Sequence, residues 1–174
     1  QPGPRWQYAG TVLDAYETAP REAGEQRPRK ILVTVGGEQF PFDRLFDAVA
    51  TTLPEGIDVL WQAGETPVPE GLPGRVVTWL DYAEMERAVD EADLVITHAG
   101  VGSVLTVLSR GKLPLILARR RDLGEHVDDH QHEWASIVTE QGLAVDLAAE
   151  AVDAAVHRAM STRVIARPRP QLVL

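Results

Sequence analysis

Short, nearly continuous apolar runs alternate along this chain with segments whose apolar residues recur at helical spacing. The runs have the length and β-branched content of buried strands. The segments between them place their apolar side chains on one face, as amphipathic helices do. The pattern predicts strands at 30–35, 57–62, 75–80, 94–97, 113–118 and 143–145, and helices at 42–52, 82–91, 101–109, 128–141 and 148–160.

Strands that alternate with helices through short connections are typical of α/β domains with a parallel sheet. The strands are apolar almost throughout instead of alternating with polar residues, so both faces of the sheet must be covered. We therefore predict an α/β fold of the Rossmann-like, three-layer kind, with a parallel sheet and helices on both of its faces.

The two ends of the chain depart from this pattern. Residues 1–28 combine a segment of extended character at 6–13 with a charged, proline-containing stretch at 19–28. We expect them to be the end of a preceding domain and a linker. Residues 29–160 hold the predicted Rossmann-like domain. Residues 161–174 alternate arginine and proline before an apolar end and are expected to form a C-terminal tail.

Composition and charge exclude several classes of protein. The net charge of −9 argues against a nucleic-acid partner, which would need a basic surface. There is no cysteine, which rules out a disulfide framework and thiolate zinc sites. No apolar run reaches the roughly 18–20 residues of a membrane span, and no signal peptide is visible. We expect a cytoplasmic protein.

The candidate functional site lies between Ala92 and Gln131. The strand at 94–97 ends in the turn His98-Ala99-Gly100-Val101-Gly102-Ser103, and a helix follows. Glycines let a ligand approach the backbone, and the free N–H groups and dipole of a helix N-terminus favour an anion. The next strand leads into the polar cluster Gly124–Gln131. Because neighbouring parallel strands end at the same edge, we expect both loops to face one crevice.

Other common motifs are incomplete. Gly36-Gly37 follows the first strand without the remaining glycine or the acidic residue of a dinucleotide fingerprint, so a nicotinamide oxidoreductase has little support. A tight turn is an equal alternative for this pair. There is no P-loop, and Ser103 lacks the flanking glycines of a hydrolase nucleophile.

Two charged clusters leave alternatives open. His126, His130 and His132 lie near two aspartates, but the glutamate that follows the first histidine of a zinc protease is missing, and the spacing differs. We therefore predict no metal site and favour solvated or hydrogen-bonded histidines. The run Arg119-Arg120-Arg121 is either a solvated charge cluster or a set of cations directed at phosphates.

Three segments resemble the C-terminal, donor-binding domain of GT-B glycosyltransferases of the family 28 type. They are Val33–Gly36 with the following Pro41–Leu45, the turn His98–Ser103, and the Gly-Glu-x-x-x-Asp-His-Gln pattern at Gly124–Gln131. The resemblance extends over about residues 30–147. It points to the peptidoglycan and dolichol-linked N-acetylglucosaminyltransferases and to bacterial exopolysaccharide glycosyltransferase subunits.

The resemblance implies a hexosyltransferase that uses a nucleotide-sugar donor, a UDP-sugar above all, inverts the anomeric centre and needs no metal or other cofactor. It also implies a set of donor-binding residues, grouped by the part of the donor that each would touch. These are Gly100, Val101, Gly102, Ser103 and His98 for the diphosphate; Glu125, Asp129, His130 and Gln131 for the sugar; Trp79, Leu80 and Thr106 for the nucleoside; and Gly36 and Gly37 for a loop on the acceptor or phosphate side.

One position departs from the family pattern. Many relatives carry a ribose-binding glutamate three residues after the serine of the turn, where this chain has Thr106. A threonine offers one hydroxyl where a carboxylate accepts two hydrogen bonds. Ribose recognition must therefore come partly from elsewhere or be weaker.

GT-B enzymes react between two Rossmann-like domains, and the resemblance covers only the donor-binding one. We therefore expect the catalytic base outside this chain. It would belong to a missing N-terminal acceptor domain or to a separate partner subunit, and that partner would bring peripheral association with the inner face of a membrane. Because the first residue is Gln1, an excised C-terminal half is favoured over a stand-alone subunit. A non-catalytic recruiting subunit and a GT-B-like epimerase are the alternatives.

Overall fold

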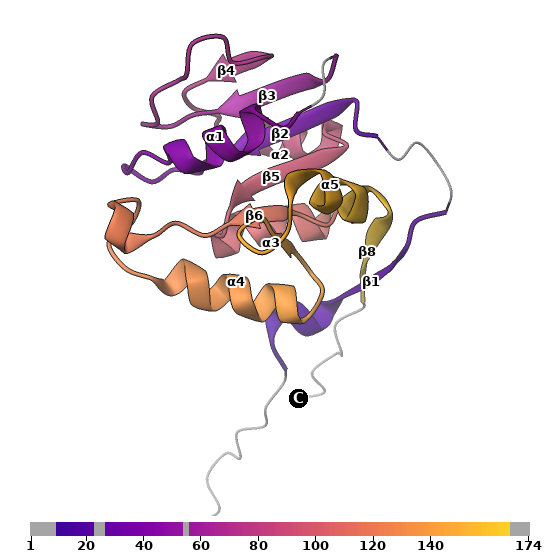
Figure 1. Ribbon diagram of the computed structural model, residues 1–174. Coiled ribbons are helices and arrows are strands. Elements are labelled where there is room, and N and C mark those ends of the chain that lie inside the picture. The colour runs from indigo at the N-terminus through magenta and orange to yellow at the C-terminus, as the bar shows by residue number, and fades with distance from the viewer. Residues whose placement is uncertain (1–9, 23–26, 54–55, 168–174) are drawn as a thin grey trace, which may run out of the picture.

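The computed structural model describes residues 10–22, 27–53 and 56–167 (Figure 1). The helices are α1 (Asp43–Ala50), α2 (Tyr82–Glu91), α3 (Val101–Ser109), α4 (His130–Glu140) and α5 (Val152–Met160), with short 3-10 helices η1 (Val12–Ala15) and η2 (Arg121–Leu123). The strands are β1 (Tyr16–Pro20), β2 (Lys30–Thr34), β3 (Asp58–Gln62), β4 (Arg75–Val77), β5 (Leu94–His98), β6 (Leu115–Leu117), β7 (Val145–Asp146) and β8 (Thr162–Ala166). Within these ranges no helix has the length and apolar character to cross a membrane.

Six strands form one parallel sheet in the order β4-β3-β2-β5-β6-β7. The direction of winding reverses between β2 and β5, which pair with Thr34 opposite Thr97. On the other side of β5, His98 lies opposite Leu117 of β6. The loops after β2, β5 and β6 therefore leave the same edge of the sheet around the reversal point, where ligands bind in folds of this class.

Helices cover both faces of this sheet, because alternate residues of its central strands point in opposite directions. Ile31 and Val33 of β2 belong to the larger core together with Phe46 of α1, whereas Leu32 packs in a smaller core with Val89 of α2. In Figure 1, α1 and α5 lie in front of the sheet and α2 and α3 behind it. The predicted Rossmann-like, three-layer α/β fold is confirmed.

The helix boundaries follow local capping. Asp81 caps α2, since its carboxylate accepts a hydrogen bond from the Glu84 amide while the Glu84 carboxylate accepts one from the Asp81 amide. At the other end of α2, the Lys112 ammonium donates to the Asp90 and Ala92 carbonyls. This cap explains why α2 occupies the predicted range. Burial of the ammonium lowers the pKa of Lys112.

The chain ends form a second, two-stranded sheet that the apolar pattern did not reveal. Antiparallel β1 and β8 pair from Tyr16–Ala166 to Pro20–Thr162, so β8 lies in the segment expected to be a tail and β1 overlaps the expected linker. Val12 and Leu13 are in a 3-10 helix, so the extended character predicted for them was wrong. Residues 6–9 of that extended segment and residues 168–174 lie outside the described part.

Candidate functional site

The first turn of α3 opens at the sheet edge directly after β5. Gly100 is the N-cap and supplies no side-chain cap, and the first backbone bond of the helix runs from the Val104 amide to the Gly100 carbonyl (3.0 Å). The N–H groups of residues 101–103 therefore have no partner within the helix. Together with the helix dipole they make this turn attractive to an anion.

Two of the nearby glycines are required by packing. A Cβ atom added at Gly36 would lie 2.3 Å from His98 Cε1, and one added at Gly100 would lie 2.2 Å from His98 Nε2. Gly36 also has a φ of +76°. The His98 imidazole therefore fills the space between the loops after β2 and β5, and neither glycine can carry a side chain.

Gly102 is different, because a Cβ atom added there would meet nothing within 4 Å. It is the second residue of α3 and its φ lies outside the positive region that favours glycine. Neither packing nor backbone conformation explains this glycine. It keeps the surface in front of the free N–H groups open.

His98 is buried at the end of β5, with 7% of its surface exposed. Burial, together with the nearby charges of Arg119 and His126, lowers the pKa of His98 to about 4. The imidazole is therefore neutral at pH 7. It supports the turn at the start of α3 by packing and contributes no positive charge to it.

A pocket of about 310 Å³ lies between α2 and α3, next to this turn. Gly102, Ser103 and Thr106 line it from α3, and Tyr82 and Glu86 line it from α2. The remaining lining is mainly apolar and comes from Met85, Val89, Val95 and Val107, with Thr34 and Thr97. The Thr106 hydroxyl donates to the Gly102 carbonyl (2.8 Å), so its hydrogen is already used.

Trp79 lies beside the loop after β2. It follows β4 in the segment that leads to α2, and 60% of its surface is exposed. A Cβ atom added at Gly37 would lie 3.1 Å from Trp79 Cη2. The strand predicted at 75–80 ends earlier, at Val77, so Trp79 and Leu80 belong to this connecting segment. The predicted nucleoside residue Trp79 and the Gly36-Gly37 loop are thus neighbours.

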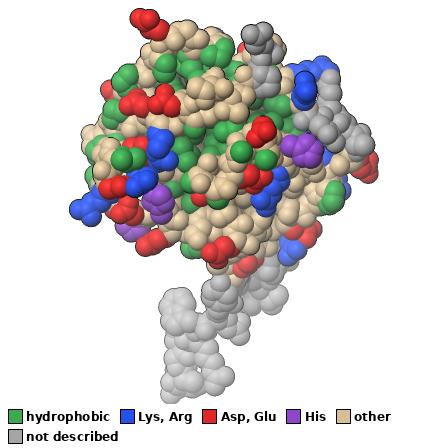
Figure 2. Space-filling view, in the orientation of Figure 1, with side chains coloured by type: hydrophobic (Ala, Val, Ile, Leu, Met, Phe, Trp, Pro, Cys, Tyr) green, Lys and Arg blue, Asp and Glu red, His purple; other side chains and the backbone are tan. Residues whose placement is uncertain are grey.

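The arginine run divides into two kinds of side chain. Arg119 is fully buried, with its guanidinium donating to the carbonyls of Val35 (2.8 Å), Phe40 (2.8 Å) and Glu125 (3.0 Å). It therefore ties the loop after β2 to the loop after β6, a role that neither alternative from the sequence included. Arg120 is exposed and pairs with Asp122. Figure 2 shows basic, acidic and histidine side chains mixed over this edge, without a basic patch.

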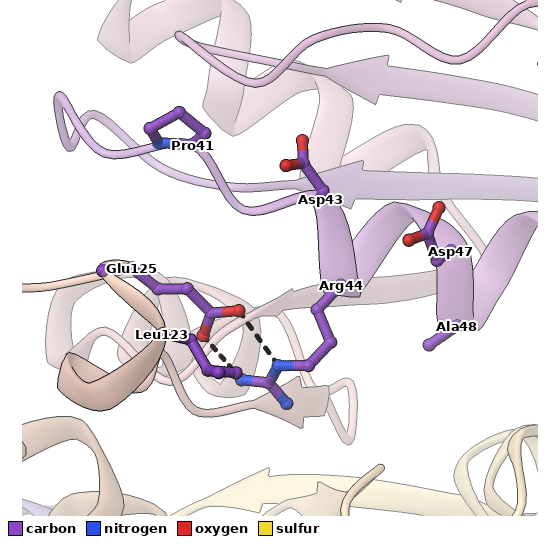
Figure 3. A pocket seen from close by; sticks show the side chains of 8 residues that line it. Pro41, Asp43, Arg44, Asp47, Ala48, Leu123 and Glu125 are labelled. Atoms are coloured by element: carbon purple, nitrogen blue, oxygen red, sulfur yellow. Dashed lines mark hydrogen bonds and ion pairs between the residues drawn. The ribbon is translucent and has the colours of Figure 1, made fainter.

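Glu125 is held in place by an ion pair (Figure 3). Its carboxylate accepts from Arg44 Nε at 3.0 Å and Arg44 Nη2 at 2.7 Å, and also from the Arg120 amide at 2.8 Å. The pair lies at the wall of an open pocket of about 810 Å³ between α1 and the loop after β6. Both carboxylate oxygens of Glu125 are thus engaged within the protein.

The remaining predicted sugar residues lie at the start of α4. Gln131 is nearly buried, and its Oε1 accepts from the Arg119 amide (3.3 Å), while its Nε2 has no hydrogen-bond partner in the described ranges. Asp129 is the exposed N-cap and accepts from the Arg121 amide (3.3 Å). His130 Nδ1 lies 2.8 Å from Asp128, which raises the pKa of His130.

The same aspartate also contacts a second histidine, since His126 Nδ1 lies 3.1 Å from Asp128 Oδ1. His130 is hydrogen-bonded to the Asp128 carboxylate, whereas His126 Nδ1 accepts a hydrogen bond from the Asp128 amide at 3.3 Å. Among the described residues, no three or more histidines and carboxylates come together in a way that could hold a metal ion.

Several residues of this edge have contacts that the sequence did not predict. Arg119 and Arg44 act through carbonyls and a carboxylate that lie far away along the chain, so no local pattern identifies them. Tyr82 and Glu86 carry a weak signal, since they are four residues apart on a predicted helix and therefore share one face of it.

Comparisons with known proteins identify the family of this chain. The model of the glycosyltransferase family 28 C-terminal domain matches residues 30–164. The UDP-N-acetylglucosamine transferase subunit ALG13 of Cryptococcus neoformans is 41% identical over 71 residues, which are 40% of this chain and 34% of that protein. The UDP-N-acetylglucosamine--N-acetylmuramyl-(pentapeptide) pyrophosphoryl-undecaprenol N-acetylglucosamine transferase of Stutzerimonas stutzeri is 30% identical over 87% of this chain and 44% of that protein.

Solved glycosyltransferases share the fold. The glycotransferase of kitacinnamycin superposes with a TM-score of 0.55 at 20% identity, covering 82% of this chain and 37% of that one. MurG of Acinetobacter baumannii superposes with a TM-score of 0.50 at 21% identity, covering 80% and 46%. The chain spans less than half the length of each of these relatives. Because the family model matches most of its residues, the chain belongs to the glycosyltransferase family 28 C-terminal domain family.

Proposed function

We propose that this domain binds the nucleotide-sugar donor, a UDP-sugar, of an inverting hexosyltransferase. The observation that carries the proposal is the open first turn of α3 at Gly102, which adjoins the pocket between α2 and α3. A diphosphate at this turn would leave room for its nucleoside in the pocket. The two curated relatives are named as transferases of N-acetylglucosamine from its UDP derivative, and this supports a UDP-sugar.

The N–H groups of Val101, Gly102 and Ser103 would bind the diphosphate in this proposal. As the bond to the sugar breaks, negative charge grows on the departing UDP. Fixed backbone dipoles that already point at this position stabilise that charge without rearranging. The turn can therefore stabilise the negative charge of the leaving group, as a metal ion does in other enzymes. We expect transfer without a metal. His98 would hold the turn in shape as a neutral ring.

The sugar would lie towards the start of α4. Gln131 suits a sugar hydroxyl because its Oε1 is fixed by the Arg119 amide while its Nε2 can donate. Asp129 is exposed at the helix N-terminus and can accept. Glu125 is bound to Arg44, so we assign it the task of positioning the loop instead of direct contact with the sugar.

The acceptor site and the catalytic base would come from a partner, either a second domain or a separate subunit. Exposed apolar side chains lie at the same edge of the sheet and support a partner that covers this surface. They are Trp79, Val101, Leu123 and Val127. The relative described as a transferase subunit favours a separate partner, and the longer relatives favour a second domain. Either partner would bring the domain to a lipid-linked acceptor at a membrane.

Calorimetric titration of this chain with UDP, UDP-N-acetylglucosamine, UDP-glucose and a TDP-sugar, in EDTA and in magnesium, tests the proposal. We expect one nucleotide to bind equally well in both buffers. Gln131→Ala should weaken the UDP-sugar without changing the affinity for UDP, whereas Gln141→Ala at the opposite end of α4 should change neither. Absence of binding by all four ligands would refute the proposed function.

A further inference from the structure

The pocket between α2 and α3 contains a single carboxylate among its lining residues, that of Glu86. The pocket begins at Gly102 and Ser103, where the diphosphate is proposed to bind. In a nucleoside diphosphate the ribose is joined directly to the phosphate, so the ribose must lie near the mouth of this pocket. A polar group at the mouth of the pocket therefore lies closer to the ribose than to the base.

Two neighbours orient the Glu86 carboxylate by binding the same oxygen. Arg110 Nη2 donates to Oε1 at 2.8 Å and the Tyr82 hydroxyl donates to Oε1 at 3.1 Å. The hydrogen bond to Glu86 also raises the pKa of Tyr82, whose phenol is a donor at neutral pH in any case. In the described ranges Oε2 has no hydrogen-bond partner, and the side chain is 34% exposed. One oxygen is thus fixed and the other is available.

The free oxygen has the capacity that a ribose requires. Each carboxylate oxygen offers two lone pairs, so Oε2 can accept from two adjacent hydroxyl groups. Thr106 lines the same pocket from α3, but its hydroxyl hydrogen is already donated to Gly102. Arg110 balances the charge of Glu86, so the carboxylate does not repel a nearby diphosphate as strongly as an unpaired one would.

We propose that Glu86 is a specificity-determining residue that accepts hydrogen bonds from the ribose 2′- and 3′-hydroxyls of the nucleotide. This role rests on the proposed function. The carboxylate reaches the pocket from α2, on the wall opposite Thr106, and so provides the ionised acceptor that α3 lacks. It makes the domain selective for ribonucleotides over deoxyribonucleotides.

Calorimetry with UDP and 2′-deoxy-UDP tests this role. The wild-type chain should bind UDP at least about tenfold more tightly, the lower limit for one hydrogen bond to a charged group. Glu86→Gln should remove most of that difference by weakening UDP while leaving 2′-deoxy-UDP nearly unchanged. Asp90→Asn is the matched control, because Arg110 also pairs with Asp90 at 3.1 Å and Asp90 does not line the pocket. It should keep the wild-type preference.

Three outcomes separate this inference from the function on which it rests. If the wild-type chain binds both nucleotides equally, or if Glu86→Gln weakens both to the same degree, Glu86 only joins α2 to α3 and the inference is refuted. If neither nucleotide binds, the proposed function fails together with the inference. Adding Thr106→Glu to Glu86→Gln should restore the preference for UDP, since it returns a carboxylate to the same pocket.

Discussion

Gly102→Ala separates the affinity for the donor from the stability of the fold, because it should lower the affinity and raise the stability. The added methyl group meets no atom within 4 Å, and the residue lies in the first turn of α3. Alanine in place of glycine in a helix stabilises by about 0.5–1 kcal/mol, through the lower entropy of the unfolded chain. For a chain of this size, 1 kcal/mol corresponds to about 2–4 °C in Tm. The variant should therefore melt slightly higher than the wild type.

The same methyl group should weaken binding of the donor. It would occupy the open space in front of the N–H groups of residues 101–103, and the diphosphate would have to move away from them. Loss of one hydrogen bond to a charged group costs about 1.5–3 kcal/mol. We therefore expect the Kd for UDP to rise about 10- to 150-fold.

Calorimetry and thermal unfolding of the same preparation measure both effects. Ser109→Ala, at the exposed far end of α3, is the control and should change the Kd less than twofold. Gly100→Ala provides the contrast: its methyl group would lie 2.2 Å from His98 and should lower both stability and affinity. A Gly102→Ala variant that binds UDP like the wild type would show that the first turn of α3 does not hold the diphosphate. One that melts lower would show that the space in front of Gly102 is not open.

Two further predictions concern the buried polar groups beneath the site. Arg119→Met should lower the free energy of unfolding in urea by at least about 3 kcal/mol, because three carbonyls, two of them buried, lose their donor. Arg119→Lys should recover only part of this loss. A loss below about 1 kcal/mol for Arg119→Met would contradict this role. Because burial lowers the pKa of His98 to about 4, the unfolded chain binds this proton first as the pH falls. The free energy of unfolding should hold its full value above about pH 6.5 and fall by about 3 kcal/mol by pH 4. His98→Gln should flatten that part of the profile, and an unchanged profile would contradict it.

The main sheet could be predicted because its strands are buried on both faces. Continuous apolar runs such as residues 31–33 in β2 and residues 94–96 in β5 identify these strands. The β1–β8 ribbon could not be predicted in this way. Only Val164 of its residues is buried, so no apolar alternation distinguishes it from a linker and a tail.

The candidate site shows a similar division. The turn at His98–Ser103 was identifiable because its chemistry is local: a strand end, small residues and a helix start follow one another. The nearness of β5 and β6 was also predictable from parallel winding, and it is confirmed. The orientation of Glu125 and Arg119 depends instead on partners far along the chain, and charge alone gave no indication of it.

In the turn at the start of α3, the tightly packed Gly100 lies two residues from the open position Gly102. This arrangement suits a site that another domain or subunit completes. His98 fills the space between Gly36 and Gly100, and Arg119 fixes the neighbouring loops through their carbonyls. These contacts hold the N–H groups of α3 in one direction before any ligand arrives. If this site binds the donor as proposed, it would lose little entropy when UDP binds, and a partner would need to add only the acceptor and the base. Substitutions at Gly102 should therefore lower the activity of the complete enzyme by much more than they change the stability of the fold.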